Sequence, residues 1–393
     1  MERPDRVHPG EPGTQTTTTT ARQHGRRAPS RIVFLADAAS VLNQRWLRYA
    51  ADRGHEVHVI TLDASDSPLE QVTQHIVGEW LPAATPRSMR MLAAIPQVRT
   101  LLRRLQPDLV HSHYAFGFGI WGAASGAHPL IVSAWGTDVM GEGAESGMHA
   151  RILRWVFAQA DAVCATGEQL AVATRRFTSH PVTVTPFGVD TDLFHPEDPL
   201  PDLTTEAGIA DRPLRLGMVK RLDDNSGIEV LLRALALDDA PGLATLDVIG
   251  SMVEPGWPGL ARELGLGDRV TFHGVLSPEE LARHLRTWDI AVQPTRWVEG
   301  YGVSALEAAA SGVPVVASRL GGLQEVVEDA VSGLLIPPND ALRLAQALSQ
   351  LDSAPETRRR MGAAGRARVL GRYDQRAAEA AMDQVYDRML EKV

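Results

Sequence analysis

Short runs of apolar residues alternate with longer amphipathic segments along most of the chain, beginning near residue 31. The first run, Arg31 to Ala36, is continuous rather than alternating, which is typical of a parallel strand buried on both faces. A helix is expected from Asn43 to Arg53, ending before the C-cap residue Gly54. Alternation of this kind predicts right-handed crossovers and a doubly wound α/β sheet.

The same pattern predicts the rest of two domains. In the first half we expect strands at 57–62, 109–111, 130–133 and 162–165, with helices before Pro107 and at 150–159. A proline-rich and acidic stretch then interrupts the pattern. In the second half we expect strands at 214–219, 245–249, 270–273, 290–293 and 313–317, with helices starting at Ile228 and Pro278. Ser277, Pro278 and Glu280 have the spacing of a helix capping box.

These elements divide the chain into a tail, two domains and a linker. Residues 1–30 are polar, with a threonine run and no apolar segment, and are predicted to be a disordered tail. The boundaries predicted for the remainder are an N-terminal domain at 31–190, a linker at 191–212 and a C-terminal domain at 213–372. The helical end of the chain, 373–393, is expected to return to the N-terminal domain.

Composition narrows the class of protein. With 393 residues, 44% apolar and 22% charged, the chain is typical of a two-domain globular enzyme. A net charge of -9 argues against a nucleic-acid partner, because proteins that bind nucleic acids usually have a basic surface. A single cysteine, Cys164, excludes an intrachain disulfide and fits the cytoplasm. The strong preference for arginine over lysine indicates a GC-rich bacterial genome.

The most informative segment is the strand–loop–helix junction between Glu299 and Glu307. Two carboxylates bracket a glycine-rich turn that leads directly into the apolar helix starting at Ala305. A helix N-terminus presents unpaired backbone N–H groups and the positive end of its dipole, which suits a phosphate. The carboxylates suit hydroxyl groups instead, so the segment predicts a nucleotide-sugar site.

Other loops of the C-terminal domain follow its strands at the edge where α/β sheets bind ligands. Lys220 and Arg221 follow the first strand, and the arginine suits a diphosphate. Gly274 and Val275 follow another and offer backbone groups to a base. Any one of these residues alone would more often be a solvated side chain or a turn, and so would Glu299 and Glu307 as an isolated pair. Their convergence on one sheet edge favours function.

Three loops of the N-terminal domain are expected to lie across the cleft from this site and to contact the acceptor. They supply Asp37 and Ser40, then His113, and finally the loop from Trp135 to Asp138, which also contains Thr137. His111 is interpreted as a buried structural residue that ends its strand, and Asp138 as a functional carboxylate. The histidines, the cysteine and the carboxylates do not occur at the spacings typical of metal ligands, so no bound metal is expected.

Together these features resemble a retaining glycosyltransferase of family 4, with the GT-B fold of two Rossmann-like domains facing across a cleft. The resemblance covers nearly everything from Arg31 onward. Its most specific element is the Glu-x7-Glu motif of Glu299 to Glu307. It is supported by the segments Gly188 to Phe194, Gly312 to Ala317 and Gly321 to Val327.

The resemblance implies a role for each matching position. Glu299 would contact the donor sugar and Glu307 the ribose, while Arg221 would neutralise the leaving diphosphate. The distal phosphate would lie on backbone amides of the glycine-rich turn, which comprises Gly300, Tyr301, Gly302, Val303 and Ser304. The implied reaction transfers a hexose or N-acetylhexosamine to a hydroxyl of a small-molecule, saccharide or lipid-linked acceptor, with retention and without metal or cofactor. Glu299, Arg221 and Asp138 are the expected catalytic residues, and UDP is the expected nucleotide.

Three positions depart from the family pattern. The family pairs the arginine with a lysine about five residues on, where this chain has Asn225 and Ser226, and Lys220 is a candidate substitute. Leu42 stands where a bacterial subgroup has histidine, and the Trp135 to Asp138 loop replaces a cleft histidine. The missing lysine keeps an alternative open: a catalytically silent partner that binds nucleotide-sugar. An epimerase or phosphorylase on the same architecture is a third interpretation.

A basic and apolar segment raises the question of membrane contact. Arginines and apolar residues interleave between Arg87 and Leu105, as in helices that lie on anionic membranes. Pro96 interrupts this pattern, which favours an ordinary packed helix with a solvated basic face. Peripheral contact with the membrane is the competing interpretation.

Overall fold

The buried apolar runs form two separate parallel sheets in the computed structural model, which describes residues 29–65, 67–82, 84–141, 143–197 and 212–391. The first sheet has seven strands in the order β3-β2-β1-β4-β5-β6-β7. All of its pairings are parallel. The strands are β1 (Arg31–Leu35), β2 (Glu56–Thr61), β3 (Val72–Ile76), β4 (Leu109–His113), β5 (Leu130–Ala134), β6 (Ala162–Ala165) and β7 (Val182–Val184).

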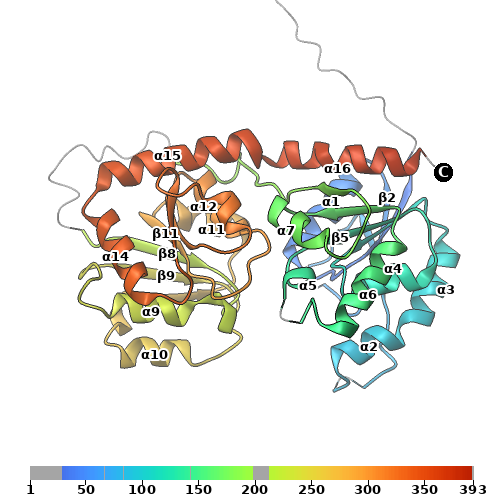
Figure 1. Cartoon of the computed structure of the whole chain (residues 1–393), viewed down its shortest axis with the longest axis horizontal. Coiled ribbons are helices and arrows are strands. Elements are labelled where there is room, and N and C mark those ends of the chain that lie inside the picture. Colours follow the sequence, from blue (N-terminus) through green and yellow to red (C-terminus); the bar gives the residue numbers. More distant parts are fainter. Residues whose placement is uncertain (1–28, 66, 83, 142, 198–211, 392–393) are drawn as a thin grey trace, which may run out of the picture.

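Helices cover this sheet because its strands are buried on both faces. They are α1 (Val41–Asp52), α2 (Arg87–Ala93), α3 (Ile95–Leu105), α4 (Phe118–Ser125), α5 (Thr137–Met140), α6 (Gly147–Ala158) and α7 (Glu168–Thr174). The sheet and these helices form one lobe of the molecule (Figure 1).

The second sheet repeats this topology with six parallel strands in the order β10-β9-β8-β11-β12-β13. The strands are β8 (Arg215–Val219), β9 (Thr245–Ile249), β10 (Val270–Gly274), β11 (Ile290–Gln293), β12 (Val315–Ser318) and β13 (Gly333–Ile336). Its helices are α9 (Ile228–Leu235), α10 (Trp257–Glu263), α11 (Pro278–Leu285), α12 (Val303–Ala310), α13 (Leu323–Val326), α14 (Ala341–Asp352) and α15 (Pro355–Arg372), with 3-10 turns at Asp224–Ser226 and Gly267–Arg269. The expected architecture of two doubly wound domains is confirmed.

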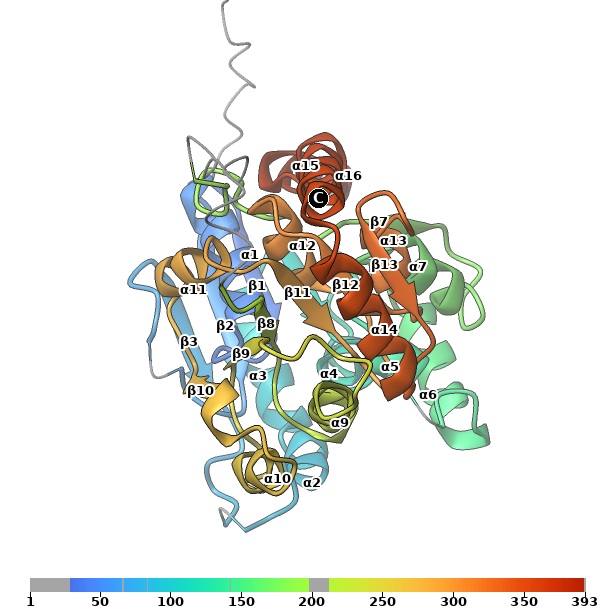
Figure 2. The same cartoon turned by 90° about the vertical axis from the view of Figure 1, so that its left-hand side faces the viewer.

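The last helix, α16 (Gln375–Leu390), returns to the first lobe. Figure 1 shows α15 and α16 end to end along one side of both lobes, and Figure 2 views them nearly along their length. The Tyr386 hydroxyl lies 2.9 Å from Nδ1 of His111, and Asp383 accepts from Tyr49 of α1. The end of the chain is therefore part of the N-terminal core.

Several elements differ from the sequence-based expectation. The capping box at Ser277 and Glu280 is confirmed, and β6, β9 and β11 have the expected bounds. Strands β3, β7 and β13 were not predicted: β3 and β7 are short and only partly apolar, and the apolar run of β13 has only four residues. Likewise, β4 continues to His113, so His111 lies within the strand rather than at its end. The predicted tail and linker fall mostly on residues outside the described ranges.

The segment from Arg87 to Leu105 is two helices rather than one. Helix α2 ends at Ala93 and α3 begins at Ile95, with Pro96 in its first turn, where a proline is tolerated. None of the residues of α2, all of which are described, is buried. Among the described helices, none combines the length and apolar character needed to cross a membrane.

Candidate functional site

The glycine-rich turn leads from β11 into α12 at the carboxyl edge of the second sheet. Gly302 has a φ of +91° and stands as the N-cap of α12, a backbone conformation that glycine adopts without steric cost. The helix starts at the next residue, so the N–H groups of Val303 and Ser304 have no carbonyl four residues earlier within the helix. This turn therefore presents the amides expected for phosphate binding.

Glu299 lies beside the only lysine that the structure describes. Its Oε2 contacts Nζ of Lys220, and it accepts a hydrogen bond of 3.3 Å from Thr295 Oγ1. Lys220 also donates to Thr295 Oγ1 at 2.9 Å. Both side chains of the ion pair are about 15% exposed. A partly shielded cation thus stands next to the carboxylate predicted to meet the donor sugar.

Arg221, the next residue, has a more open environment. Its guanidinium is 70% exposed and donates to Oδ2 of Asp223 at 2.6 and 3.0 Å. A diphosphate would compete with the partly exposed Asp223 for these donors, which is a small obstacle because ion pairs near the surface contribute little. The predicted diphosphate contact of Arg221 stays a prediction.

The two residues at the position of the missing lysine have structural partners. Asn225 donates to the Val298 carbonyl at 2.7 Å and accepts from the amides of Trp297 and Val298. Ser226 is fully buried and accepts from the Ile228 amide. Asn225 therefore holds the loop that carries Glu299, and neither residue supplies a charge. The sequence did not indicate this role, because the partners are over seventy positions apart.

Gly274 and Val275 end β10 at the surface. Gly274 has a φ of +73°, its carbonyl accepts from the Gly250 amide, and the Val275 side chain is 73% exposed. Both residues are thus accessible at the strand end, and the predicted contact of their backbone groups with a base stays a prediction.

The surroundings of Tyr301 and of the two glycines after β12 show which parts of the site are open to a donor. The Tyr301 ring is 3% exposed and packs against Phe187 and Tyr373, so only its backbone can reach a ligand. A Cβ on Gly321 would lie 2.0 Å from the Glu299 carbonyl oxygen, and one on Gly322 would lie 2.4 Å from Tyr301 Cα. These glycines let their backbone approach the glycine-rich turn closely.

Glu307 has a partner from the other domain. Its buried carboxylate accepts from Arg45 of α1 at 2.7 Å, and Arg45 also donates to the Gly188 carbonyl. Burial raises the pKa of Glu307, while the neighbouring guanidinium opposes this shift. Its second oxygen is left for the predicted ribose contact. This pairing could not be predicted from local patterns, because the two residues are distant along the chain.

Asp138 does not have the catalytic environment expected for it. Its side chain is buried at the start of α5 and accepts from the amides of Ala115, Trp135 and Gly136 at 2.7 to 3.1 Å. Burial raises the pKa of Asp138, and these amide contacts lower it. A carboxylate enclosed by backbone donors orders its loop and has no route to a reacting hydroxyl, so the prediction is wrong.

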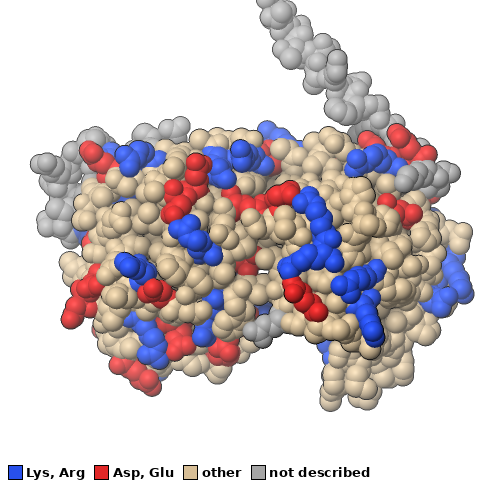
Figure 3. All heavy atoms as spheres, in the orientation of Figure 1, with Lys and Arg blue, Asp and Glu red and all other residues tan. Residues whose placement is uncertain are grey.

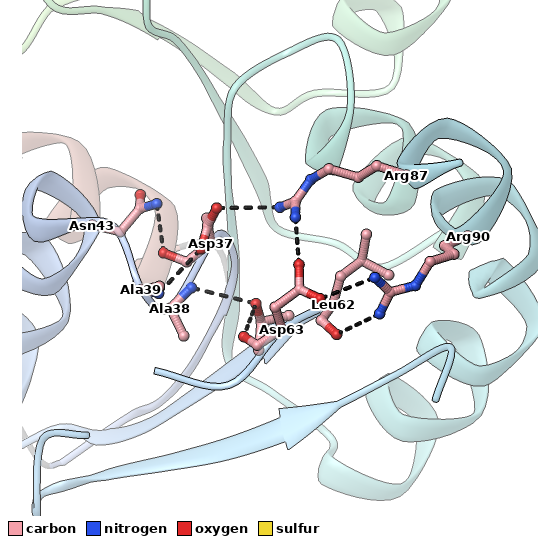
Figure 4. A network of polar contacts seen from close by, with 9 residues as sticks. Asp37, Ala38, Ala39, Asn43, Leu62, Asp63, Arg87 and Arg90 are labelled. Carbon is pink, nitrogen blue, oxygen red and sulfur yellow. Dashed lines mark hydrogen bonds and ion pairs between the residues drawn. The ribbon is translucent and has the colours of Figure 1, made fainter. Parts of the chain in front are cut away.

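Asp37 and Ser40 belong to the loop after β1. Asp37 pairs with Arg87 of α2 at 3.2 Å, and its carbonyl accepts from Asn43 (Figure 4). Arg87 also contacts Asp63, which in turn accepts from Arg90 at 3.0 Å. Ser40 is the N-cap residue of α1 but makes no side-chain cap bond. The acceptor-side loops are thus tied to α2 by ion pairs.

His113 is a buried neutral residue rather than an open acceptor contact. Its Nδ1 lies 2.7 Å from Asn43 Oδ1, and its ring packs on Trp135. Desolvation keeps the pKa of His113 well below its usual range. Nε2 is buried and has no hydrogen-bond partner among the described residues. Direct contact between His113 and an acceptor is therefore contradicted by its burial.

The loop of Trp135 and Thr137 faces the donor side across the cleft. A Cβ on Gly136 would lie 2.9 Å from Gly300 Cα, so the loops of the two domains nearly touch. The exposed Thr137 hydroxyl lies 2.5 Å from the Tyr114 hydroxyl. Tyr114 has a φ of +73°, which is rare for a bulky side chain and points to a functional constraint. The motif analysis did not single it out, because sequence does not reveal a strained φ.

One group of three potential metal ligands is formed by the described residues. Atoms of Asp247, His273 and His284 lie within 4.8 Å of one another. Asp247 already accepts from His273 and from the Trp288 indole at 2.7 and 2.9 Å. The three residues lie on β9, β10 and α11, so no local spacing could reveal them.

Two family models match the chain. The model for glycosyl transferases group 1 matches residues 202–368, and the model for glycosyl transferase 4-like proteins matches residues 31–167. D-inositol 3-phosphate glycosyltransferase of Stackebrandtia nassauensis is 32% identical, over 86% of this chain and 87% of that protein. An MMP alpha-(1->4)-mannosyltransferase of Mycolicibacterium hassiacum is 35% identical over 53% of this chain and 49% of its own length.

Solved structures share the whole fold at low identity. Sucrose-phosphate synthase from Thermosynechococcus elongatus superposes with a TM-score of 0.76 at 23% identity, covering 93% of this chain and all of that chain. Anabaena Alr3699/HepE, solved with UDP and glucose, gives a TM-score of 0.73 at 18% identity, covering 91% of this chain and 99% of that chain. The arrangement of both domains is therefore common to these structures.

Proposed function

The chain belongs to the group 1 glycosyltransferases of the family 4 type, and from this premise we propose that it transfers a hexose or N-acetylhexosamine from a nucleoside-diphosphate sugar to an acceptor hydroxyl, with retention of configuration. The observation that carries this proposal is the grouping of Lys220, Arg221 and Glu299 at the N-terminus of α12. Cations, helix amides and a carboxylate there match the charges and hydroxyls of such a donor.

Each group has a task in the proposed reaction. The amides that begin α12 and the Arg221 guanidinium bind the diphosphate, whose negative charge grows as the bond to the sugar breaks. Such preorganised electrostatic stabilisation is commonly the largest contribution to catalysis. Glu299 binds sugar hydroxyls, and Glu307 binds the ribose through the oxygen that Arg45 does not engage. Transfer on one face of the sugar needs no protein nucleophile.

Lys220 takes the place of the family's missing lysine in this proposal. Its ammonium already lies against Glu299 and Thr295, next to Arg221 in sequence. When a donor occupies the site, the ammonium can turn from the carboxylate to a phosphate oxygen. The two cations and the helix dipole supply positive charge from the protein itself, and we propose that no divalent cation is required.

A uridine nucleotide is the proposed carrier. The fold neighbour Alr3699/HepE was solved with UDP-glucose, whereas one relative is named as a GDP-mannose-dependent mannosyltransferase. The loop at Gly274 and Val275 is where the base would lie, and its backbone groups can accept or donate to either base.

The test is donor-dependent release of free nucleotide. The protein is incubated with UDP-glucose, UDP-N-acetylglucosamine and GDP-mannose, with and without excess EDTA. Nucleotide release that is insensitive to EDTA and absent from Glu299→Ala supports the proposal. Donor binding without any release, across this panel and a range of hydroxyl acceptors, would favour the silent-partner alternative. Inhibition by EDTA would contradict only the proposed metal independence, and not the transfer reaction. Asp247, His273 and His284 would then be the first candidates for metal ligands.

A further inference from the structure

An apolar pocket of about 390 Å³ opens in the N-terminal lobe, beside the cleft. Its walls come from α2, α4 and α6 and from the loop after β4. Met91, Phe116, Phe118, Trp121 and Ile152 supply most of the lining, with Arg87 at its edge. This volume lies within the usual range of small-molecule sites, which are mostly apolar with a few polar groups at the rim.

The pocket is held open by polar contacts around it. Arg87 and Arg90 join α2 to Asp37 and Asp63, as Figure 4 shows, and the Trp121 indole donates to the Met91 carbonyl at 2.7 Å. Because these contacts fix α2 without burying its apolar side chains, the wall does not collapse into the space. Such a preformed cavity costs little ordering when a ligand enters.

Tyr114 connects the pocket to the reaction centre. Its ring lines the pocket, its hydroxyl bonds to Thr137, and Thr137 belongs to the loop that meets Gly300. Burial raises the pKa of the Tyr114 hydroxyl, while the hydrogen bond with Thr137 and the positive charge of Arg221 from the other domain lower it. The strained backbone at Tyr114 holds this ring between the pocket and the donor site.

The surroundings are apolar as well. Trp80, Met89 and Leu92 are each more than half exposed, and the last two belong to α2. In Figure 3 the tip of the lobe around α2 is almost without charged side chains on the face shown, and the surface is indented between the lobes. An apolar ligand would therefore find a continuous approach.

From these contacts we propose that the acceptor is amphipathic: an apolar ring system or chain occupies this pocket, and its hydroxyl is presented past Tyr114 to the donor sugar. The inference rests on the proposed function and names the acceptor class for it. In the reaction the acceptor oxygen bonds to the anomeric carbon, the bond from that carbon to the diphosphate breaks, and the hydroxyl proton leaves with the diphosphate.

The test fills the pocket and measures binding without turnover. 2-Naphthol, an apolar ring with one hydroxyl, is the probe, and its binding is measured by equilibrium dialysis. Ile152→Phe narrows the pocket from α6, whereas Met148→Phe adds the same ring to that helix at a position that is 68% exposed. We expect at least tenfold weaker binding by the first variant and less than a twofold change for the control. Equal binding by both variants, or none by the wild type, would overturn the inference.

A parallel measurement separates this inference from the proposed function. UDP-glucose binding and the slow release of nucleotide by transfer of sugar to water, without added acceptor, do not use the pocket, so Ile152→Phe should keep both. Release of nucleotide without binding of 2-naphthol would contradict the acceptor role of the pocket and leave the proposed glycosyltransferase reaction intact. Naphthol binding without release from any donor would reject the reaction, and the acceptor role with it.

A second arm distinguishes a soluble acceptor from a lipid. Transfer of labelled sugar is compared between 2-naphthol in solution and dodecanol in phosphatidylglycerol vesicles. Preferred transfer to either one, with loss in Ile152→Phe, supports the inference and identifies the source. Preferred transfer to glycerol over both would overturn it.

Discussion

Lys220 illustrates how a single side chain can restore a charge lost elsewhere in a motif. The position that usually carries the cation holds Ser226, whose hydroxyl is buried against the start of α9. Lys220 reaches Glu299 from the end of β8 instead. In the proposed reaction, a lysine from the end of β8 therefore supplies the charge that relatives place near residue 226.

Replacing Lys220 by methionine tests this assignment. Loss of a charged hydrogen bond costs about 1.5–3 kcal/mol, so kcat should fall roughly 10- to 150-fold. Lys220→Arg should recover part of the loss because it keeps the charge. Arg283→Met on the surface of α11 serves as a control and should leave kcat unchanged. A methionine variant with wild-type kcat would remove Lys220 from the mechanism.

His111 provides a residue-scale prediction about pH. The ring is fully buried between Tyr386 and Ser133, and burial lowers its pKa to about 3. The unfolded chain therefore binds a proton near the ordinary pKa of about 6.5, whereas the folded protein does not. Stability is fully present above that pH and falls as the pH drops towards 3. One such histidine contributes about 1.4 kcal/mol per pH unit in this window.

Urea unfolding between pH 7.5 and 5 measures the effect. His111→Gln removes the titrating group, so the slope of unfolding free energy against pH should decrease by up to about 1.4 kcal/mol per unit below pH 6.5 and change little above pH 7. His113 adds a slope in the same direction, which the variant keeps. An unchanged slope in the glutamine variant would show that His111 is protonated in the folded protein.

At the scale of the element, α12 depends on the conformation of the residue that precedes it. Gly302 turns the chain so that the helix amides point towards the cleft, and its φ of +91° excludes most side chains. A Cβ there would also lie 3.0 Å from Leu323 Cδ2. Both the strand end and the phosphate site therefore rely on this glycine.

Gly302→Ala should weaken donor binding more than it destabilises the fold. Left-handed backbone costs a residue with a Cβ about 1–2 kcal/mol, so a loss of stability of that size is expected. The donor KM should rise as well, because the turn shifts. Gly265→Ala is the matched control, since Gly265 has a φ of +73° and open space around it. Gly265→Ala should lower the free energy of unfolding by a similar amount and leave the donor KM unchanged. If both variants raised the donor KM equally, the role of the glycine-rich turn would be contradicted.

At the scale of the whole molecule, the two lobes are joined by contacts between specific groups. Arg45 pairs with Glu307, and Glu325 of α13 accepts from the amides that begin α7 at 2.5 and 2.9 Å. Phe187 packs between Trp135 and Tyr301. These contacts link Trp135 in the loop after β5 to the glycine-rich turn of the other lobe.

Arg45→Met should destabilise the protein in a pH-dependent way. Removing one partner of a buried ion pair costs about 3–5 kcal/mol, and the partial exposure of Arg45 places the effect near the lower limit. Without the guanidinium, the pKa of Glu307 rises further and its protonated form tolerates burial. The loss should therefore shrink as the pH falls from 7.5 to 5.5. Arg48→Met, on the exposed side of α1, should change stability little at either pH. A pH-independent loss would indicate lost packing alone.

Local patterns predicted most of the strands well. Continuous apolar runs such as 162–165 and 290–293 can only be buried on both faces, so the sequence determined their structure and bounds. Strand β7 has three residues and little apolar signal, and β13 has only four residues; each forms beside a neighbouring strand that supplies its hydrogen bonds. This pairing between strands is a tertiary contact, so it cannot be predicted from the residues of the short strand alone.

What the sequence by itself determined is the pair of doubly wound domains and the segment from Glu299 to Glu307, because periodicity, caps and glycine turns act over a few residues. The tertiary structure decided which side chains meet. Folding pairs Glu307 with Arg45 and Lys220 with Glu299. It also buries Asp138 and His113 and places Tyr114 at an apolar pocket. These outcomes depend on burial and on contacts between distant segments, which exist only after the chain has folded.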